Sequence, residues 1–188
     1  MAGFTALYDA CVLYPASLRD LLLSIARTNL FRARWTNQIH EEWIAALLIQ
    51  RPELKDRLVR TRALMNEAVP DCLIEGYEPL IAGLTLPDPD DRHVLAAAIA
   101  GQASVIVTYN LADFPAELLR PWDIEAMHPD EFVMCQFDLD APAVCGEIKK
   151  LRARLKNPPV SVEQYLQTLA QLRLPRVVEK LTEMKELI

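Results

Sequence analysis

Residues 87–108 read PDPDDRHVLAAAIAGQASVIVT, and this stretch gives the clearest indication of the fold class. Its proline- and aspartate-rich start is typical of a turn that caps a helix, and apolar residues follow at helical spacing from Val94. The run Val105-Ile106-Val107 is apolar and β-branched, which predicts a strand buried on both faces. A helix that leads into such a strand indicates crossover connections and a mainly parallel sheet covered by helices. We therefore expect an α/β fold.

The segments on either side of this stretch differ in their pattern of apolar residues. Residues 4–8 form a second short apolar run, which predicts another buried strand that ends just before Asp9. Helical spacing of apolar residues predicts several further helices, at residues 17–30, from 37 onward, 52–68, 141–156, 161–172 and 175–188. Beyond about Phe137 the sequence predicts only helical segments. We therefore expect an α/β domain over residues 1–136 and a small helical C-terminal extension over residues 137–188.

Composition narrows the class of protein. The chain has 188 residues, 52% of them hydrophobic, so it can bury a sizeable core. Its net charge of −6 is unfavourable for binding nucleic acid, unless bound cations or local basic patches offset it. The four cysteines are scattered and exclude a CxxC zinc site. With no secretory signal and no long apolar run in the sequence, we expect a cytoplasmic protein with no membrane segment.

Acidic residues follow both predicted strands. Asp9 comes directly after the first strand and Asp113 a few residues after the second, and the carboxyl ends of parallel strands gather functional groups. The sequence leaves open whether Asp91, at the start of the intervening helix, lies near them. Glu42 stands beside the apolar face of its helix and could point into a cleft. Carboxylates without matching cations favour bound Mg²⁺ or Mn²⁺, and such a site supports phosphodiester hydrolysis.

Each acid also has an ordinary structural interpretation. Asp88, Asp90 and Asp91 could serve only as turn and cap residues, and Glu42 could be a solvated helix position. His93 is expected to face solvent or to pack on its own helix. The individual positions therefore leave the function open, and the order of the motifs has to decide it.

Four segments in order resemble the motifs of PIN-domain proteins, especially the VapC-like subgroup. They are YDACVLYP at residues 8–15, the stretch from Trp35 to Trp43, PDPDDRHVLAAA at residues 87–98, and VTYNLADFP at residues 107–115. The resemblance implies a three-layer α/β/α fold and RNA cleavage that depends on Mg²⁺ or Mn²⁺. The helical tail also resembles one that is appended to some members of the subgroup.

The resemblance also assigns roles by position. It implies that the catalytic and metal-binding acids are Asp9, Glu42, Asp91 and Asp113. Auxiliary or orienting residues would be Asp88, Asp90, Thr108 and Asn110. Asp90 is also the rival of Asp91 for the third acidic position, and Glu41 is the rival of Glu42 for the second. Candidates for substrate contact are Arg19, Arg92 and the basic group at residues 149–156.

The implied function is a metal-dependent endoribonuclease, the toxin of a type II toxin–antitoxin pair, with RNA as substrate, a cognate antitoxin as partner and a homodimer as the usual assembly. One position departs from the family pattern, because Cys11 stands where Asn is common. A catalytically silent interaction module with the same fold is therefore the alternative. A phosphatase of the haloacid dehalogenase type ranks lower, because it needs an aspartate at the position of Cys11. The tail, which has apolar stripes but no acidic cluster, is expected to support packing or partner binding rather than chemistry.

Overall fold

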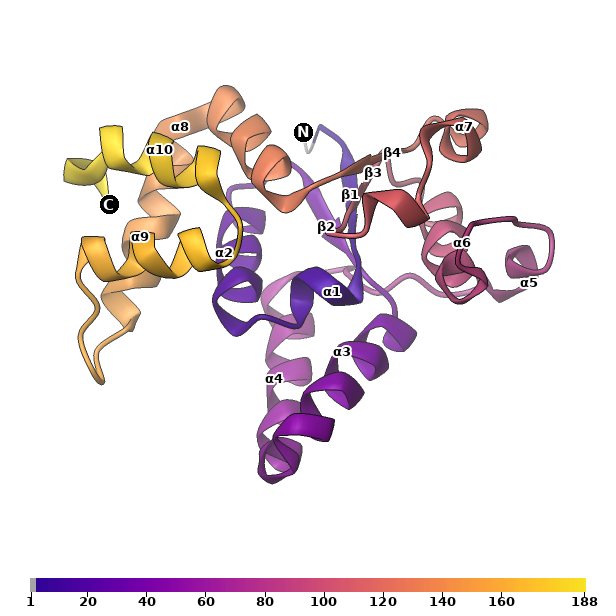
Figure 1. Ribbon diagram of the computed structural model, residues 1–188, viewed down its shortest axis with the longest axis horizontal. Helices are drawn as coiled ribbons and strands as arrows, with labels where there is room; N and C mark the ends of the chain where they lie inside the picture. The colour runs from indigo at the N-terminus through magenta and orange to yellow at the C-terminus, as the bar shows by residue number, and fades with distance from the viewer. Residues whose placement is uncertain (1–2) are drawn as a thin grey trace.

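A four-stranded sheet lies at the centre of the computed structural model, which describes residues 3–188 (Figure 1). Its order is β2-β1-β3-β4, and every pair of neighbouring strands is parallel. The strands are β1 Thr5–Tyr8, β2 Arg32–Arg34, β3 Val105–Val107 and β4 Glu125–Met127. The parallel sheet flanked by helices confirms the expected α/β fold class.

The two predicted strands, β1 and β3, occupy the centre of the sheet. Their apolar side chains are buried, as the continuous hydrophobic runs require for strands covered on both faces. The register pairs Tyr8 with Val107, so both strands end at the same level. The next residues, Asp9 and Thr108, therefore leave the sheet side by side, and the backbone N–H of Asp9 donates to the carbonyl of Val107 at 3.1 Å. This register fixes the location of the first acid.

The edge strands β2 and β4 are short and were not expected from the sequence. The first reads Arg-Ala-Arg and the second Glu-Ala-Met, so each offers little apolar signal of its own. Charged residues are common on edge strands because one side of the strand faces solvent. Their formation depends on pairing with the buried central strands rather than on their own composition.

Helices cover the sheet, with α2 and α6 on opposite sides of it (Figure 1). The first half of the chain contributes α1 Ala10–Leu13, α2 Ala16–Ala26, α3 Asn37–Gln50, α4 Lys55–Ala68 and α5 Glu78–Ile81. The second half contributes α6 Arg92–Ala100, α7 Ala116–Leu119, α8 Pro129–Arg154, α9 Val162–Gln171 and α10 Pro175–Glu183. Short 3₁₀ turns include η2 Pro89–Asp91 and η3 Leu111–Asp113. None of the helices within residues 3–188 is long and apolar enough to cross a membrane.

Helix α8 links the C-terminal helices to the sheet and is longer than expected. It starts at Pro129 rather than near residue 141, and its backbone departs from helical geometry at Asp140, just before Pro142. Phe132 in its first half contacts Phe31 edge to face, with ring centroids 4.9 Å apart, and belongs to the main core. Helix α8 packs on α2, and α9 and α10 pack against this pair (Figure 1). The division at residue 137 falls inside α8 and stays a prediction.

Candidate functional site

Asp9 lies at the carboxyl end of β1 and is held by three hydrogen bonds. Its side chain is buried, with 4% of its surface exposed. Oδ1 accepts from the backbone N–H of Ala10 at 2.6 Å and so caps α1. Oδ2 accepts from the hydroxyl of Thr108 at 2.7 Å and from Sγ of Cys11 at 3.1 Å. The carboxylate is thus fixed in one orientation, which is what a metal-binding or catalytic acid needs.

Cys11 occupies the position where the family commonly has Asn, and it takes part in the same network. Its sulfur accepts from the backbone N–H of Tyr109 at 3.3 Å and lies 3.3 Å from the hydroxyl of Thr108. Burial, and then the charge of Asp9, raises the pKa of Cys11 to about 12, so the thiol stays protonated and donates to Asp9. The thiol therefore supplies both a donor and an acceptor, although each is weaker than that of an amide.

Asp91 ends η2 and faces the other acids. Its pKa is raised from 3.8 to about 7, first by burial and then by the charges of Asp9, Asp88 and Asp113. These charges act on Asp91 because the helix start and the two strand ends meet at one edge of the sheet, which the sequence left open. The site is therefore a partly desolvated group of carboxylates that repel one another.

The donor chemistry of this group suits a hard divalent cation, since the groups are carboxylate oxygens and no Lys, Arg or His among residues 3–188 lies within ion-pair distance of Asp9 or Asp91. Their spacing is more open than that of a formed ligand set: within the described chain, no three His, Cys, Asp or Glu side chains are grouped closely enough to hold an ion. The residues fit such a cation in type and charge, while the ligand set itself stays a prediction.

Glu42 is held at one side by His93. Oε1 of Glu42 lies 2.7 Å from Nε2 of His93 and accepts from Nε2 of Gln38 at 3.3 Å. The alternative that His93 faces solvent is wrong, because the residue is 4% exposed and its ring connects α6 to Glu42 of α3. Glu41, the rival position, is exposed. The structure thus favours Glu42 over Glu41 as the acid turned toward the interior.

The auxiliary candidates fall into two groups. Asp88 and Asp90 are exposed, and the Asp88 side chain caps η2 by accepting from the backbone N–H of Asp90 at 2.9 Å. Asp88 therefore has the cap role that its turn predicted, in addition to its charge effect on Asp91. Thr108 is fully buried, and its hydroxyl also accepts from the backbone N–H of the exposed Asn110 at 3.0 Å. Thr108 is thus the orienting residue with the most direct contact to Asp9.

The basic residues proposed for substrate contact are largely engaged elsewhere. Arg19 is 6% exposed, donates to the carbonyl of Leu13 at 2.6 Å and stacks on the Trp43 ring at 4.6 Å. This placement speaks against contact between Arg19 and RNA. Arg92 is half-buried and donates from Nε to the carbonyl of Pro89 at 2.9 Å. In the basic group of α8, the exposed Lys150 pairs with Glu147 at 2.7 Å.

Tyr109 is a residue that the sequence did not single out. Its backbone lies against Cys11, and its hydroxyl donates to the carbonyl of Leu172 at 2.7 Å. The guanidinium of Arg173 stacks on its ring, 4.6 Å from the centroid. No local pattern connects residue 109 to the turn between α9 and α10, so only the fold reveals that the tail reaches the site.

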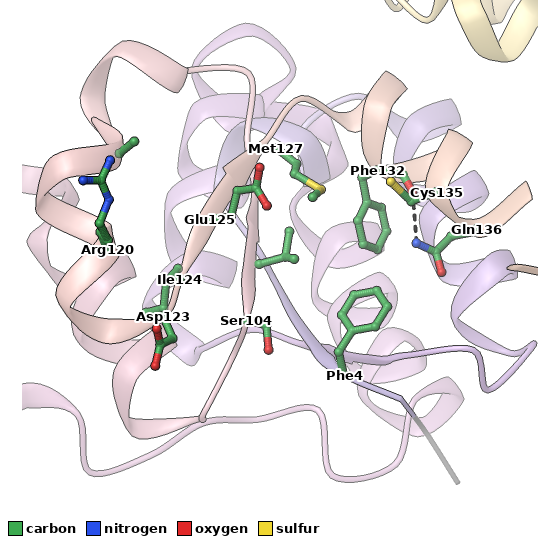
Figure 2. A pocket seen from close by; sticks show the side chains of 12 residues that line it. Phe4, Ser104, Arg120, Asp123, Ile124, Glu125, Met127, Phe132, Cys135 and Gln136 are labelled. Atoms are coloured by element: carbon green, nitrogen blue, oxygen red, sulfur yellow. Dashed lines mark hydrogen bonds between the residues drawn. The ribbon is translucent and has the colours of Figure 1, made fainter. Parts of the chain in front are cut away.

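A separate pocket of about 660 Å³ lies at the other end of the sheet (Figure 2). Phe4, Ser104 and Ile124, which precede or begin the strands, contribute to its lining together with Phe132 and Met127. None of the predicted acids lines it. Its position at the amino ends of the strands separates it from the site around Asp9.

Comparisons with known proteins agree with this arrangement. Residues 5–112 match the family model described as PIN domain, and residues 129–183 match the model described as VapC50 C-terminal domain. A curated protein of Mycobacterium tuberculosis (strain ATCC 25618 / H37Rv), named "Putative ribonuclease VapC50", is 39% identical over 105 residues. The alignment covers 56% of this chain and 61% of that protein's length. No solved structure matches the chain.

Proposed function

This chain belongs to the PIN-domain family, and from that premise we propose that it is a metal-dependent endoribonuclease. The observation that carries the proposal is the group of carboxylates at the carboxyl edge of the sheet, where Asp9 is fixed by Thr108 and the pKa of Asp91 is raised to about 7. A carboxyl group whose ionisation is costly in the folded state, as at Asp91, is typical of functional sites. The similarity to a protein named as a ribonuclease supports the same reaction class.

The proposed ligands are Asp9, Glu42, Asp91 and Asp113. A bound Mg²⁺ or Mn²⁺ would supply an activated water and charge neutralisation at the scissile phosphate. The chain's own residues contribute orientation. Thr108 and Cys11 fix the carboxylate of Asp9, and His93 holds Glu42. Cys11 keeps contact with Asp9, so it does not favour the silent interaction module.

The proposed biological role is that of the toxin in a type II toxin–antitoxin pair. RNA is the substrate, a cognate antitoxin the partner, and a homodimer the assembly. Beside the PIN-domain match, residues 129–183 match the model described as VapC50 C-terminal domain, and both this match and the similarity to the protein named VapC50 support placement in this subgroup. The net charge of −6 means that metal and a few placed cations have to attract the RNA, because the surface as a whole repels it.

The test is cleavage of single-stranded RNA with Mg²⁺ or Mn²⁺, with EDTA added, and with Asp9→Asn and Asp113→Asn variants. Asp123→Asn is the matched control, because Asp123 is exposed and lines the pocket at the opposite end of the sheet. It also has a left-handed backbone that Asn tolerates. We expect cleavage by the wild type and by the control, and none by the site variants or in EDTA. Unchanged cleavage in EDTA, or by Asp9→Asn, would overturn the proposal.

A further inference from the structure

We propose that Arg173, in the turn between α9 and α10, is a substrate-binding residue of the nuclease site and that it holds an RNA phosphate from its position on Tyr109. This inference rests on the proposed function and extends it, because it gives the C-terminal extension a part in binding RNA. The tail was expected only to pack or to bind a partner.

The first step is the attachment of the tail to the site. Tyr109 directly follows Thr108, whose hydroxyl binds Asp9, and the backbone N–H of Tyr109 donates to Cys11. From this position the Tyr109 hydroxyl donates to the carbonyl of Leu172 at 2.7 Å. Its ring also contacts His128 edge to face, with centroids 5.1 Å apart. Tyr109 thus spans the distance between the acidic site and the α9–α10 turn with a single side chain.

A second set of hydrogen bonds, accepted by Asp130, holds the turn between α9 and α10 in place. Asp130 of α8 is 6% exposed, and its carboxylate accepts from the backbone N–H groups of Arg176 at 3.2 Å and Val177 at 3.0 Å. These are the unpaired donors at the start of α10, where a negative charge is stabilising. The turn is therefore fixed at both ends, and a side chain that it carries has a defined position relative to the site.

Arg173 is the exposed cation of this turn. Its guanidinium lies 4.6 Å from the centroid of the Tyr109 ring, and no carboxylate in residues 3–188 is within ion-pair distance of it. Stacking on an aromatic ring leaves the edge of the guanidinium, with its N–H donors, available for a ligand. A planar fork of donors matches a phosphate, which is the charged group of RNA.

The backbone at Arg173 makes the position unusual. Its φ is 57°, the left-handed region. Its N–H donates to the carbonyl of Ala170 at 3.0 Å and that of Leu174 to Leu169 at 3.2 Å, the pattern that ends helices at a left-handed residue. Glycine is favoured there, because a side chain has a steric cost in this region. An arginine at a position that favours glycine points to a role for the side chain itself.

The two arginines proposed from the sequence for substrate contact, Arg19 and Arg92, are less available. Arg19 is buried under Trp43 and Arg92 donates to a backbone carbonyl. Proteins that bind single-stranded RNA commonly combine an arginine with an aromatic ring, and Arg173 on Tyr109 has this composition next to Thr108, which binds Asp9. The cation that the acidic surface lacks is therefore supplied by the tail.

The test compares Arg173→Gly with Arg173→Ala and with the control Arg176→Ala. Glycine removes the steric cost of a side chain in the left-handed region and also removes the guanidinium. A role in binding therefore predicts weaker RNA binding without a loss of stability, whereas a purely structural role predicts a change in stability without a change in RNA binding. Arg176 is exposed and lies three residues on, so its loss makes the same change of charge without touching Tyr109. Binding of a labelled single-stranded RNA, KM and kcat for its cleavage, and the melting temperature are measured for the full chain.

We expect Arg173→Gly to melt no lower than the wild type, yet to raise Kd and KM about tenfold with kcat little changed. The slope of log K against log salt should fall by about 0.7, the value for one phosphate contact on a single strand. Arg176→Ala should stay within about twofold of the wild type in Kd. Equal RNA binding by Arg173→Gly and the wild type would overturn the inference, whether or not RNA is cleaved. If the wild type binds RNA through Arg173 without cleaving it, the inference stands and the proposed nuclease activity fails.

Discussion

The hydroxyl of Thr108 lies 2.7 Å from Oδ2 of Asp9, although the two residues are 99 positions apart in the chain. The contact follows from the register of β1 and β3, which end at the same level. Thr108 is fully buried, so water does not replace its hydroxyl. The fold therefore brings a distant hydroxyl group to the first acid of the proposed site, in addition to the local hydrogen bonds from Ala10 and Cys11.

Thr108→Val should separate orientation from ligation, because it removes the hydroxyl at nearly constant volume. Asp9 and the backbone N–H of Asn110 each lose a partner, so the free energy of unfolding should fall by about 1–2 kcal/mol. The turnover number for RNA cleavage should fall by about 10- to 100-fold, because Asp9 is no longer held in place. Thr108→Ser is the matched control and should keep most of the turnover. Equal turnover for the Val variant and the wild type would show that Asp9 needs no such support.

Asp91→Asn should stabilise the metal-free protein, and the gain should grow with pH. The pKa of Asp91 is about 7 in the folded state against an ordinary 3.8, chiefly because of burial, so its ionisation costs the folded state free energy. This cost is absent below about pH 3.8, grows as the pH rises and is complete above about pH 7. Because the side chain is partly exposed, we expect a gain of about 1 kcal/mol or less at the upper end.

The measurement for Asp91 is urea unfolding in EDTA across this pH range, with the exposed Asp90→Asn as the control. The control should show no growth of stability with pH relative to the wild type. With Mg²⁺ or Mn²⁺ added, the melting temperature of the wild type should rise more than that of Asp91→Asn, because a neutral amide is a weaker ligand. Equal shifts in both proteins would place the cation elsewhere.

His40 should make the fold sensitive to acid. Its pKa is lowered from 6.5 to about 4, first by burial. Nδ1 accepts from the indole N–H of Trp43 at 3.1 Å, which leaves Nε2 to donate to Oδ1 of Asn66 at 2.9 Å. Protonation of Nδ1 would set two donors against each other. The stability of the neutral ring is complete above about pH 6.5 and is lost as the pH falls toward about 4, with a loss of about 2 kcal/mol at pH 5.

His40→Gln is the variant that tests this, since its amide has one acceptor and two donors for the same partners but does not titrate. The difference in unfolding free energy between the wild type and the variant should change by about 2 kcal/mol between about pH 7.5 and 5. A constant difference would show that folding leaves the pKa of His40 unchanged.

The sequence predicted those parts of the fold whose signals are local. The buried runs of β1 and β3 and the apolar spacing of α2, α3 and α6 predicted their elements, because burial on both faces or on one face leaves a periodic pattern. Strands β2 and β4 were missed, because three-residue edge strands with charged residues carry no such pattern. Helix α8 was predicted too short: it was expected to start near residue 141, where the chain only departs locally from helical geometry at Asp140.

The site was predictable as a set of acids but not as a set of contacts. The resemblance to PIN-domain motifs implied Asp9, Glu42, Asp91 and Asp113, whereas the contacts that support these acids depend on distant pairings. His93 binds Glu42 from another helix, and Tyr109 receives Arg173 from the C-terminal turn. Such pairings depend on the packing of elements, for which a single sequence has no local signal.

The pair formed by Glu42 and His93 leads to the last prediction, which also separates Glu42 from its neighbour. Glu42→Gln keeps the side-chain length and can still accept from His93, but it loses the charge that a hard cation needs. Cleavage should fall by about 100-fold or more, whereas Glu41→Gln, at an exposed position, should stay within about twofold.

His93→Leu tests whether Glu42 has to be held. Nδ1 of His93 is buried without a partner among residues 3–188, so an apolar replacement also removes an unsatisfied atom, and the unfolding free energy should change by about 1 kcal/mol at most. Glu42, whose side chain is 40% exposed, would then be free to turn to solvent, and cleavage should fall by about tenfold. His93→Gln can donate to Glu42 again and should recover most of the loss. Full activity of His93→Leu would mean that Glu42 finds its position without the histidine, and loss of activity in Glu41→Gln would move the second acid by one residue.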